Sequence, residues 1–491
     1  MSDATPAPPR TDTSSIDEKS GMNLKSTMSS PDPDVAALDY ASDSAGHASD
    51  KGLLLRIDLW IIPAMYILNF GAARMDTLGV SMMGFKNNDY WLSLLVFFIG
   101  YIVFQLPTAL LVRKYHPRYF LFLIVFFWGI VGGIAVAFVK DWKQLALLRG
   151  LLGGLQSGFL SVCVLLITCW YTRFELGLRL TIFYCGVTMN QGASPILIYL
   201  VALMNGLGGL VAWQWIFVIF GIIICIIGCL ALVAVQNFPE RATFLSEDDR
   251  KRVLDRLEED RNDSIACDAH VWEKIVFHFQ CWMIWALGLA YGCANVTAAS
   301  LVTIGSARIA GLGLTPAGAA GFAIAPWFIG AFIAIAASWH SDRTKMRSPY
   351  IIGGALACIV GFGCMLSSSV GAGVFGTFLT IAGSATQLPL IMVMLQNNVR
   401  GTCKRAVAGA IALAFGAIGY MASNTLYISS SAPVYRQGCI ASMAMQGGVI
   451  VIVAAVVARF RSMNARLEAE GSGFEHSDRK GVETVAWRHT L

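Results

Sequence analysis

Three ionisable residues, Arg74, Asp76 and Arg149, lie within or near long apolar segments of the chain. A charged side chain at the middle of a bilayer costs about 2.5 to 3.5 kcal/mol on insertion scales, so its presence there needs a reason. An arginine in a cavity of low dielectric constant attracts anions and can bind a carboxylate through charge-assisted hydrogen bonds. The alternative is that these side chains reach the headgroups at the membrane interface. The three residues therefore predict either an anion-binding cavity or interfacial anchors.

Uncharged polar side chains inside the apolar segments extend this pattern. Arg149 and Gln156 are seven residues apart, as are Asn69 and Asp76, so each pair shares one helical face. Such a face can line a hydrated cavity or form hydrogen bonds between helices. The predicted substrate-binding set is Asn69, Arg74, Asp76, Arg149, Gln156, Asn190, Gln191, Tyr291, Asn295 and Gln387.

Sequence features required for several other functions are missing. The chain has no G-x-x-x-x-G-K-[ST] phosphate-binding loop, and none of its 7 histidines has the spacing of a metal site. Its 12 cysteines form no C-x-x-C pair, and those inside apolar runs are interpreted as small core residues. The net charge of +5 comes from short basic clusters and not from the basic stripe of a nucleic-acid-binding protein. We therefore expect no enzymatic activity, no cofactor, no metal and no nucleic-acid partner.

The elements that must position these residues are long apolar helices. The chain has 491 residues, of which 56% are apolar and 14% charged. The apolar residues gather into segments of about 20 residues, the length that crosses roughly 30 Å of hydrocarbon. The sequence therefore predicts an all-α integral membrane protein with twelve transmembrane helices. The predicted spans are 57–80, 90–112, 118–139, 143–168, 177–203, 211–235, 276–301, 314–338, 349–370, 372–396, 406–428 and 438–460.

The connections between the spans predict orientation and domain organisation. Lys and Arg are concentrated in alternate connections, which places both termini in the cytoplasm under the positive-inside rule. A polar connection contains Ser246-Glu-Asp-Asp249, a helix-capping pattern, followed by an amphipathic segment predicted to lie under the bundle. The predicted parts are a disordered cytoplasmic tail (1–50), a six-helix bundle (51–235), a cytoplasmic linker (236–275), a second six-helix bundle (276–462) and a cytoplasmic tail (463–491).

Short motifs that follow one another along the apolar region resemble those of a known family. They include Tyr66-Ile-Leu-Asn-Phe70, Gly100-Tyr-Ile-Val-Phe-Gln-Leu-Pro107, Trp170-Tyr-Thr-Arg-Phe-Glu175, Asn237-Phe-Pro-Glu240 and Asn398-Val-Arg-Gly401. The series resembles the major facilitator superfamily, and more closely the fungal allantoate permease branch of its anion:cation symporters. The resemblance implies a 6+6 pseudo-symmetric bundle in the plasma membrane. Its central cavity, lined chiefly by spans 1, 4, 7 and 10, would open alternately to either side.

The resemblance also implies a set of gating residues. The segment Ser341-Asp-Arg-Thr-Lys-Met-Arg347 is similar to the family's gating loop, and Arg113-Lys-Tyr-His-Pro-Arg118 is similar to its first-half counterpart without the acidic residue. The predicted gating residues are Arg113, Asp342, Arg343 and Arg347.

The sequence departs from that branch at several positions. Gln105 and Gln156 stand where glutamates are usual in spans 2 and 4, and Gln214 stands where an arginine is usual in span 6. The missing carboxylates could have taken up a proton at membrane depth, so a coupling proton is left open.

These observations favour a secondary active transporter of a small organic solute, with a carboxylate or similar anion as the expected substrate. The lipid bilayer and the solute are the expected partners, and the protein is expected to be monomeric. An exporter or intracellular carrier of a secondary metabolite is the alternative, and a non-transporting permease-like receptor is a further one.

Overall fold

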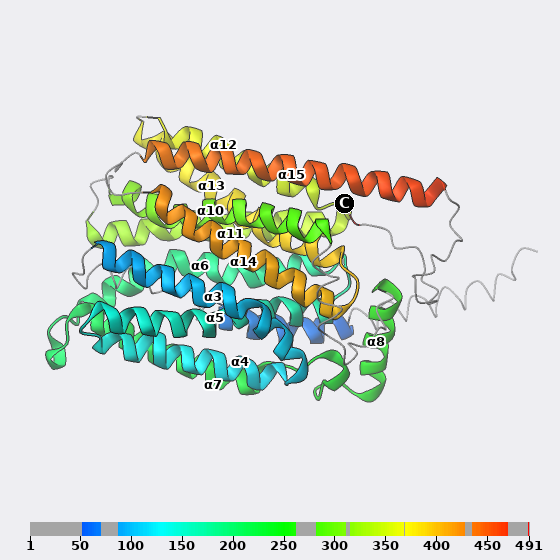
Figure 1. Ribbon diagram of the computed structural model, residues 1–491, viewed down its shortest axis with the longest axis horizontal. Coiled ribbons are helices and arrows are strands. Elements are labelled where there is room, and N and C mark those ends of the chain that lie inside the picture. The colour runs from blue at the N-terminus through cyan, green and yellow to red at the C-terminus, as the bar shows by residue number, and fades with distance from the viewer. Residues whose placement is uncertain are drawn as a thin grey trace, which may run out of the picture. The chain divides into compact units, whose positions relative to one another are not determined.

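The structure is a computed structural model that describes residues 52–69, 87–261, 281–310, 315–367, 369–427, 435–469 and Thr490. These residues are almost entirely helical and include no β-strand, and residues 55–491 form one compact unit (Figure 1). The predicted N-terminal tail, Arg74 and Asp76 lie outside the described residues.

Eleven of the described helices are long and apolar enough to cross a membrane. Span 3 is continuous but changes its winding, from α-helix to a π-helical segment and a short 3₁₀ turn. The spans are the helix Gly52–Asn69, α3 (Asn87–Lys114), α4 (Pro117–Trp128) with η1 (Gly129–Ala135) and η2 (Val136–Phe138), α5 (Trp142–Trp170), α7 (Ala212–Ala234), α10 (Trp282–Ala310), α11 (Pro316–Thr344), α12 (Ser348–Met365), α13 (Val370–Asn397), α14 (Thr402–Leu426) and α15 (Arg436–Ala469).

Helix α6 (Leu176–Ala202) has the length of a span but is not among these eleven, because polar residues interrupt its apolar sequence. It packs against α11 and α13, and it carries the adjacent amides Asn190 and Gln191. Because much of its surface contacts protein and not lipid, it does not need an apolar surface all round. With α6 the bundle has the twelve membrane helices that the sequence predicted.

The helix packing repeats between spans 1–6, here called the first half, and spans 7–12, the second half. In the first half α3 packs on α5 and α4 on α7, while the equivalent second-half pairs are α11 with α13 and α12 with α15. The two largest contacts between the halves are reciprocal, α6 with α11 and α3 with α14. This pairing confirms the expected 6+6 pseudo-symmetric fold, while the boundary residues of the domains stay a prediction.

Glycines allow several helices to cross with their backbones in contact. A Cβ on Gly133 would overlap the Cα of Gly221, and a Cβ on Gly153 would overlap the carbonyl of Phe97. The first pair joins η1 to α7 and the second joins α5 to α3, so the glycine-rich runs bring these helices close together.

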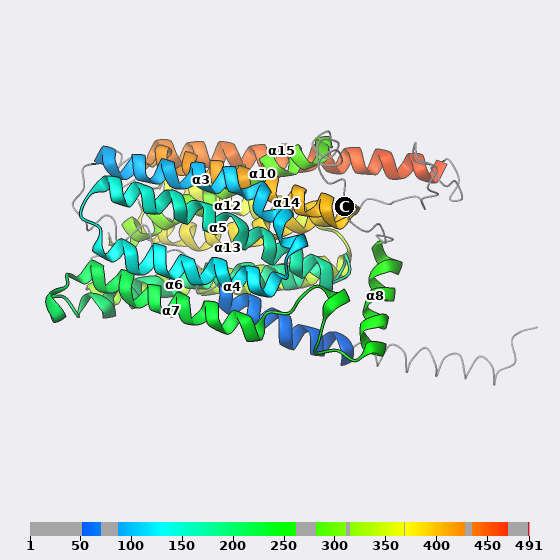
Figure 2. The same ribbon diagram turned by 60° about the horizontal axis from the view of Figure 1, so that its bottom comes forward.

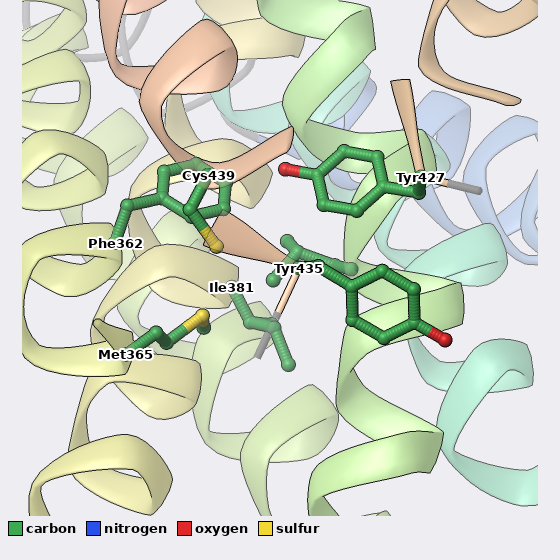
Figure 3. Packing of buried hydrophobic residues seen from close by; sticks show 7 residues of the cluster. Phe362, Met365, Ile381, Tyr427, Tyr435 and Cys439 are labelled. Atoms are coloured by element: carbon green, nitrogen blue, oxygen red, sulfur yellow. The ribbon is translucent and has the colours of Figure 1, made fainter. Parts of the chain in front are cut away.

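A buried hydrophobic cluster at the start of α15 packs helices of the second half against one another. Figure 3 shows Phe362 and Met365 of α12, Ile381 of α13 and Cys439 of α15 meeting near Tyr427 and Tyr435. The Tyr427 hydroxyl lies 2.7 Å from Ser442 Oγ, so its polar atom is hydrogen-bonded although the ring is buried.

Helix α8 (Glu247–Arg261) lies across one end of the membrane helices (Figures 1 and 2). The backbone N–H of Asp249 donates a hydrogen bond to Ser246 Oγ at 3.1 Å, which confirms the predicted cap. Val253 is buried, while Leu254 and Leu257 on the same face are half-buried. We call this end of the bundle the α8 end.

Candidate functional site

A cavity of about 240 Å³ lies between the two halves. Its walls come from α3, α5 and α6 of the first half and from α10, α11, α13 and α14 of the second half, with single residues from the first span and α4. The sequence predicted walls from spans 1, 4, 7 and 10, and the structure adds spans 2, 5, 8 and 11. These added spans are the helices that form the contacts between halves.

Five of the predicted substrate-binding residues line this cavity: Asn69, Gln156, Gln191, Tyr291 and Asn295. The Asn69 amide already donates to the Phe183 carbonyl at 2.6 Å, which fixes its position. Gln156 differs because its Nε2 is buried and has no hydrogen-bond partner among the described residues. An unpaired buried donor is costly, so Gln156 is the lining residue best prepared to receive an acceptor from a ligand.

Three other predicted residues are buried away from the cavity lining. Arg149 is 4% exposed and lies two helical turns before Gln156 on α5. Asn190 is bonded within its own helix, where Ser194 Oγ donates to its side-chain oxygen at 2.8 Å. Gln387 is fully buried, and its Nε2 lies 3.8 Å from Cys358 Sγ of α12. Of these three, Gln387 contacts a neighbouring helix, whereas the bond between Asn190 and Ser194 stays within α6.

Aromatic residues line the cavity more densely than sequence reasoning expected. The missed residues include Tyr101, Tyr184, Trp327 and Tyr420. Tyr184, Thr188 and Gln191 are spaced so that they lie on one face of α6. This spacing could have identified Tyr184 as a lining residue from the sequence.

Two hydroxyl contacts join the halves between the cavity and the α8 end. The Tyr184 and Tyr291 hydroxyls lie 3.1 Å apart and connect α6 to α10. One turn nearer the start of α6, Thr181 Oγ1 lies 2.6 Å from Ser338 Oγ of α11. The cavity is therefore closed toward the α8 end by hydrogen bonds that can break and reform.

The predicted gating loop forms a stronger closure at the α8 end itself. Lys345 adopts a left-handed conformation with φ of 55°, which ends α11 and turns the chain so that Arg347 pairs with Asp342. Asp342 Oδ2 also accepts the Leu178 backbone N–H at 2.7 Å, and Arg347 Nη2 donates to the Arg173 carbonyl at 3.1 Å. This pair thus binds the start of α6 across the two halves, where the N–H groups of a helix favour a carboxylate.

The buried ion pair fits closely against a glycine. A Cβ on Gly177 would overlap both the Asp342 carboxylate and the Arg347 guanidinium. Burial lowers the pKa of Arg347 from its ordinary value, and the Asp342 carboxylate opposes that shift. Of the other predicted gating residues, Arg343 is exposed and lies over the Trp339 ring of its own helix. The side chain of Arg113 lies outside the described residues.

Helix α8 is attached to this closure through the α5–α6 connection. Arg256 Nη2 lies 2.8 Å from Glu175 Oε2, and the Arg173 backbone N–H donates to Asp260 Oδ2 at 2.7 Å. Arg261 Nη2 donates to the Tyr171 carbonyl at 2.8 Å. Because Arg173 also accepts the bond from Arg347, α8 and the gating loop hold the same short segment.

Two of the three glutamines at which the sequence departs from the branch it resembles, Gln105 and Gln214, have structural partners. Gln105 donates to Ser161 Oγ between α3 and α5, and Gln214 Nε2 donates to the Ala137 carbonyl at 2.9 Å. Gln214 Oε1 also accepts the Val211 backbone N–H at 2.9 Å at the start of α7. Both residues therefore hold helices together.

This arrangement is suited to binding a solute and to movement of the two halves. The described residues contain no group of three or more His, Cys, Asp or Glu that could hold a metal ion. They do contain a central cavity and a breakable closure between two similar halves. A sequence model described as the Major Facilitator Superfamily matches residues 60–455. This chain belongs to the Major Facilitator Superfamily.

Other members of the superfamily match most of the chain. The MFS transporter prlL of a fungal species is 26% identical over 402 residues, which cover 78% of this chain and 80% of that protein. The high-affinity nicotinic acid transporter of Saccharomyces cerevisiae is 23% identical over 451 residues, covering 87% of this chain and 81% of that protein. The structure is similar to that of the proton:xylose symporter XylE, with a TM-score of 0.63 at 13% identity, covering 81% of this chain and 94% of that chain.

Membership of the superfamily settles the class of this protein. It is a multi-pass integral membrane transporter and not an enzyme. The likeness to XylE supports the fold alone, because 13% identity says nothing about the residues that contact a solute.

Proposed function

We propose that this protein moves a small organic solute by alternating access, and that the solute is a carboxylate or similar anion. The observation that carries the proposal is a cavity between the halves that hydrogen bonds and an ion pair close toward the α8 end. When those contacts break and equivalent ones form at the other end, a solute in the cavity changes sides.

Two features support a carboxylate as the solute. The buried Nε2 of Gln156 has no acceptor among the residues that the structure describes, and a carboxylate oxygen supplies a strong one. The nicotinic acid transporter of yeast is similar over most of the chain, and the compound in its name carries a carboxylate. Arg149 lies outside the cavity but two turns from Gln156, toward the end opposite α8. We infer that it attracts the anion along its path.

We propose that the α8 end faces the cytoplasm and that the membrane is the plasma membrane. Basic residues gather at this end, among them Arg118, Arg173 and Lys404. Arg56 of the first span lies 3.7 Å from Asp249 of α8, and α15 also ends on this side (Figure 1). Both termini and the linker would then be cytoplasmic. Labelling of either terminus from outside intact cells would contradict this orientation.

Purified protein in vesicles tests the transport proposal. We expect uptake of labelled carboxylates. We expect Arg149→Ala to lower it about tenfold and Arg149→Lys to retain most of it, because only the alanine variant loses the positive charge that attracts the anion. An imposed pH gradient tells whether a proton is coupled. Uptake of anions that is unchanged in Arg149→Ala would remove the role of that residue, and binding without flux of any compound would favour a receptor.

A second candidate is an exporter or intracellular carrier of a less charged secondary metabolite. Among the described lining residues of the cavity there is no Lys, Arg, His, Asp or Glu, which favours a neutral solute. Accumulation of a pathway product in cells that lack the protein would support export, and normal secretion would exclude it.

A further inference from the structure

The cavity is far richer in aromatic side chains than the chain as a whole. Nine of its 27 lining residues are Phe, Tyr or Trp, whereas aromatic residues make up 11% of the sequence. Aromatic residues on the outside of a membrane protein contact lipid. Aromatic residues that line a cavity between the halves instead contact the solute that occupies the cavity. This enrichment therefore bears on the solute.

The rings come from both halves. Tyr184 and Tyr291 meet through their hydroxyls at 3.1 Å, and the ring of Phe98 lies 5.6 Å from that of Tyr420, with the planes tilted by 39°. The first pair joins α6 to α10 and the second joins α3 to α14. A solute in the cavity is thus placed between aromatic surfaces of two bodies that separate during transport.

The remaining lining limits the solute further. Trp327 of α11 lines the cavity and packs against the buried cluster of Figure 3, so its ring is supported from behind. The buried Nε2 of Gln156 offers one donor that has no partner within the described part of the chain. An apolar cavity of about 150 Å³ holds one benzene molecule. The cavity here, of about 240 Å³, has room for one ring with a polar substituent or for two fused rings.

We propose that the cavity selects a flat aromatic or heteroaromatic compound that carries a hydrogen-bond-accepting group. The ring packs face-on or edge-on against aromatic side chains of both halves, and the acceptor receives a hydrogen bond from Gln156. The inference rests on the proposed transport function, and it names the ring as the feature that the site recognises. Offset and edge-to-face ring pairs gain attraction beyond the area that they bury, whereas a saturated ring of similar size gains only the burial.

A matched pair of solutes tests this in vesicles containing the wild-type protein. Benzoate and cyclohexanecarboxylate carry the same charge on rings of similar size, but only benzoate is flat and aromatic. Two ring contacts predict about a tenfold preference for benzoate. Benzamide, which keeps the ring and an acceptor oxygen without the charge, tells whether the acceptor must be anionic. Equal uptake of benzoate and cyclohexanecarboxylate would overturn the inference and leave the transport proposal intact.

Substitutions in α11 extend the test. The quantity measured is the ratio of benzoate uptake to cyclohexanecarboxylate uptake, which does not depend on the amount of protein in the vesicles. We expect Trp327→Leu to bring the ratio toward one and Trp327→Phe to retain it. Phe332→Leu is the matched control, since Phe332 lies on the same helix and is 62% exposed on the outside of the bundle. If Trp327→Leu does not fold, Tyr420→Leu with Tyr420→Phe as its partner serves the same purpose. A ratio that no such substitution changes would overturn the inference, and absence of flux for every compound would contradict the transport proposal itself.

Discussion

At the scale of single residues, the polar side chains within the bundle divide into two groups. Asn190, Gln105 and Gln387 have neighbours on adjacent turns or helices and support the packing. Gln156 has a donor beside the cavity with no partner in the described ranges, and Tyr291 bonds across the halves. A buried donor without a partner costs free energy, so a ligand that supplies an acceptor recovers that cost when it binds.

Gly177 gives a test of the closure at this scale. We expect Gly177→Ala to weaken the closure by about 1 to 3 kcal/mol, because its Cβ overlaps the Asp342–Arg347 pair. The rate at which an impermeant maleimide labels Thr181→Cys from the α8 side should rise at least about fivefold. Gly353→Ala is the control, since nothing lies within 4 Å of its added Cβ. Equal labelling in both backgrounds would show that the ion pair does not hold the gate.

At the scale of elements, α6 and α8 have different roles in the closure of the α8 end. Helix α6 carries residues of the closure at its start and of the cavity wall farther along, so a tilt of this one helix alters both. Helix α8 is not part of the membrane bundle, yet it holds the connection that precedes α6 through Glu175 and Arg173. The linker between the halves is therefore mechanically connected to the gate.

A charge exchange tests that connection. Arg256→Glu places two carboxylates opposite each other, so we expect α8 to loosen and proteinase K to cleave it about two- to fivefold faster. Exchanging both residues, Glu175→Arg with Arg256→Glu, should return the rate toward that of the wild type. Lys251→Glu makes the same charge change on the exposed side of α8 and serves as control. Failure of the double exchange to restore protection would argue against the ion pair.

At the scale of the whole molecule, the proposed alternating access requires the two halves to separate at the α8 end. The bonds described here that join the halves at this end are hydrogen bonds, and none of them is covalent. Polar contacts of this kind can exchange with water when the end opens, whereas a large apolar interface would resist separation.

A reversible crosslink tests this motion. Thr181 and Ser338 have their hydroxyls 2.6 Å apart, so Thr181→Cys with Ser338→Cys should form a disulfide under oxidation. We expect transport to fall to background in the oxidised protein and to return on reduction. The two single variants carry the same native cysteines and should keep their transport under oxidation. Undiminished transport by the crosslinked protein would contradict a pathway that opens at the α8 end.

The sequence by itself determined the twelve-helix fold. The length of each apolar segment predicts a membrane span, and the basic residues of each connection predict its side of the membrane, without any knowledge of how the helices pack. It also located Asn69, Gln156, Gln191, Tyr291 and Asn295, whose polarity within spans singled them out and which line the cavity. Only the tertiary structure separated these from Gln387 and Asn190, because polarity does not tell a helix face that meets a cavity from one that meets another helix.

The aromatic character of the cavity was likewise decided by tertiary structure. Aromatic residues are common throughout apolar spans, so Trp327 and Tyr420 carry no signal of their own in the sequence. They become parts of one wall only when helices from both halves pack around a shared space. Closure at the α8 end depends on tertiary structure in the same way, since Asp342 and Leu178 are 164 residues apart and meet only when α6 packs against α11.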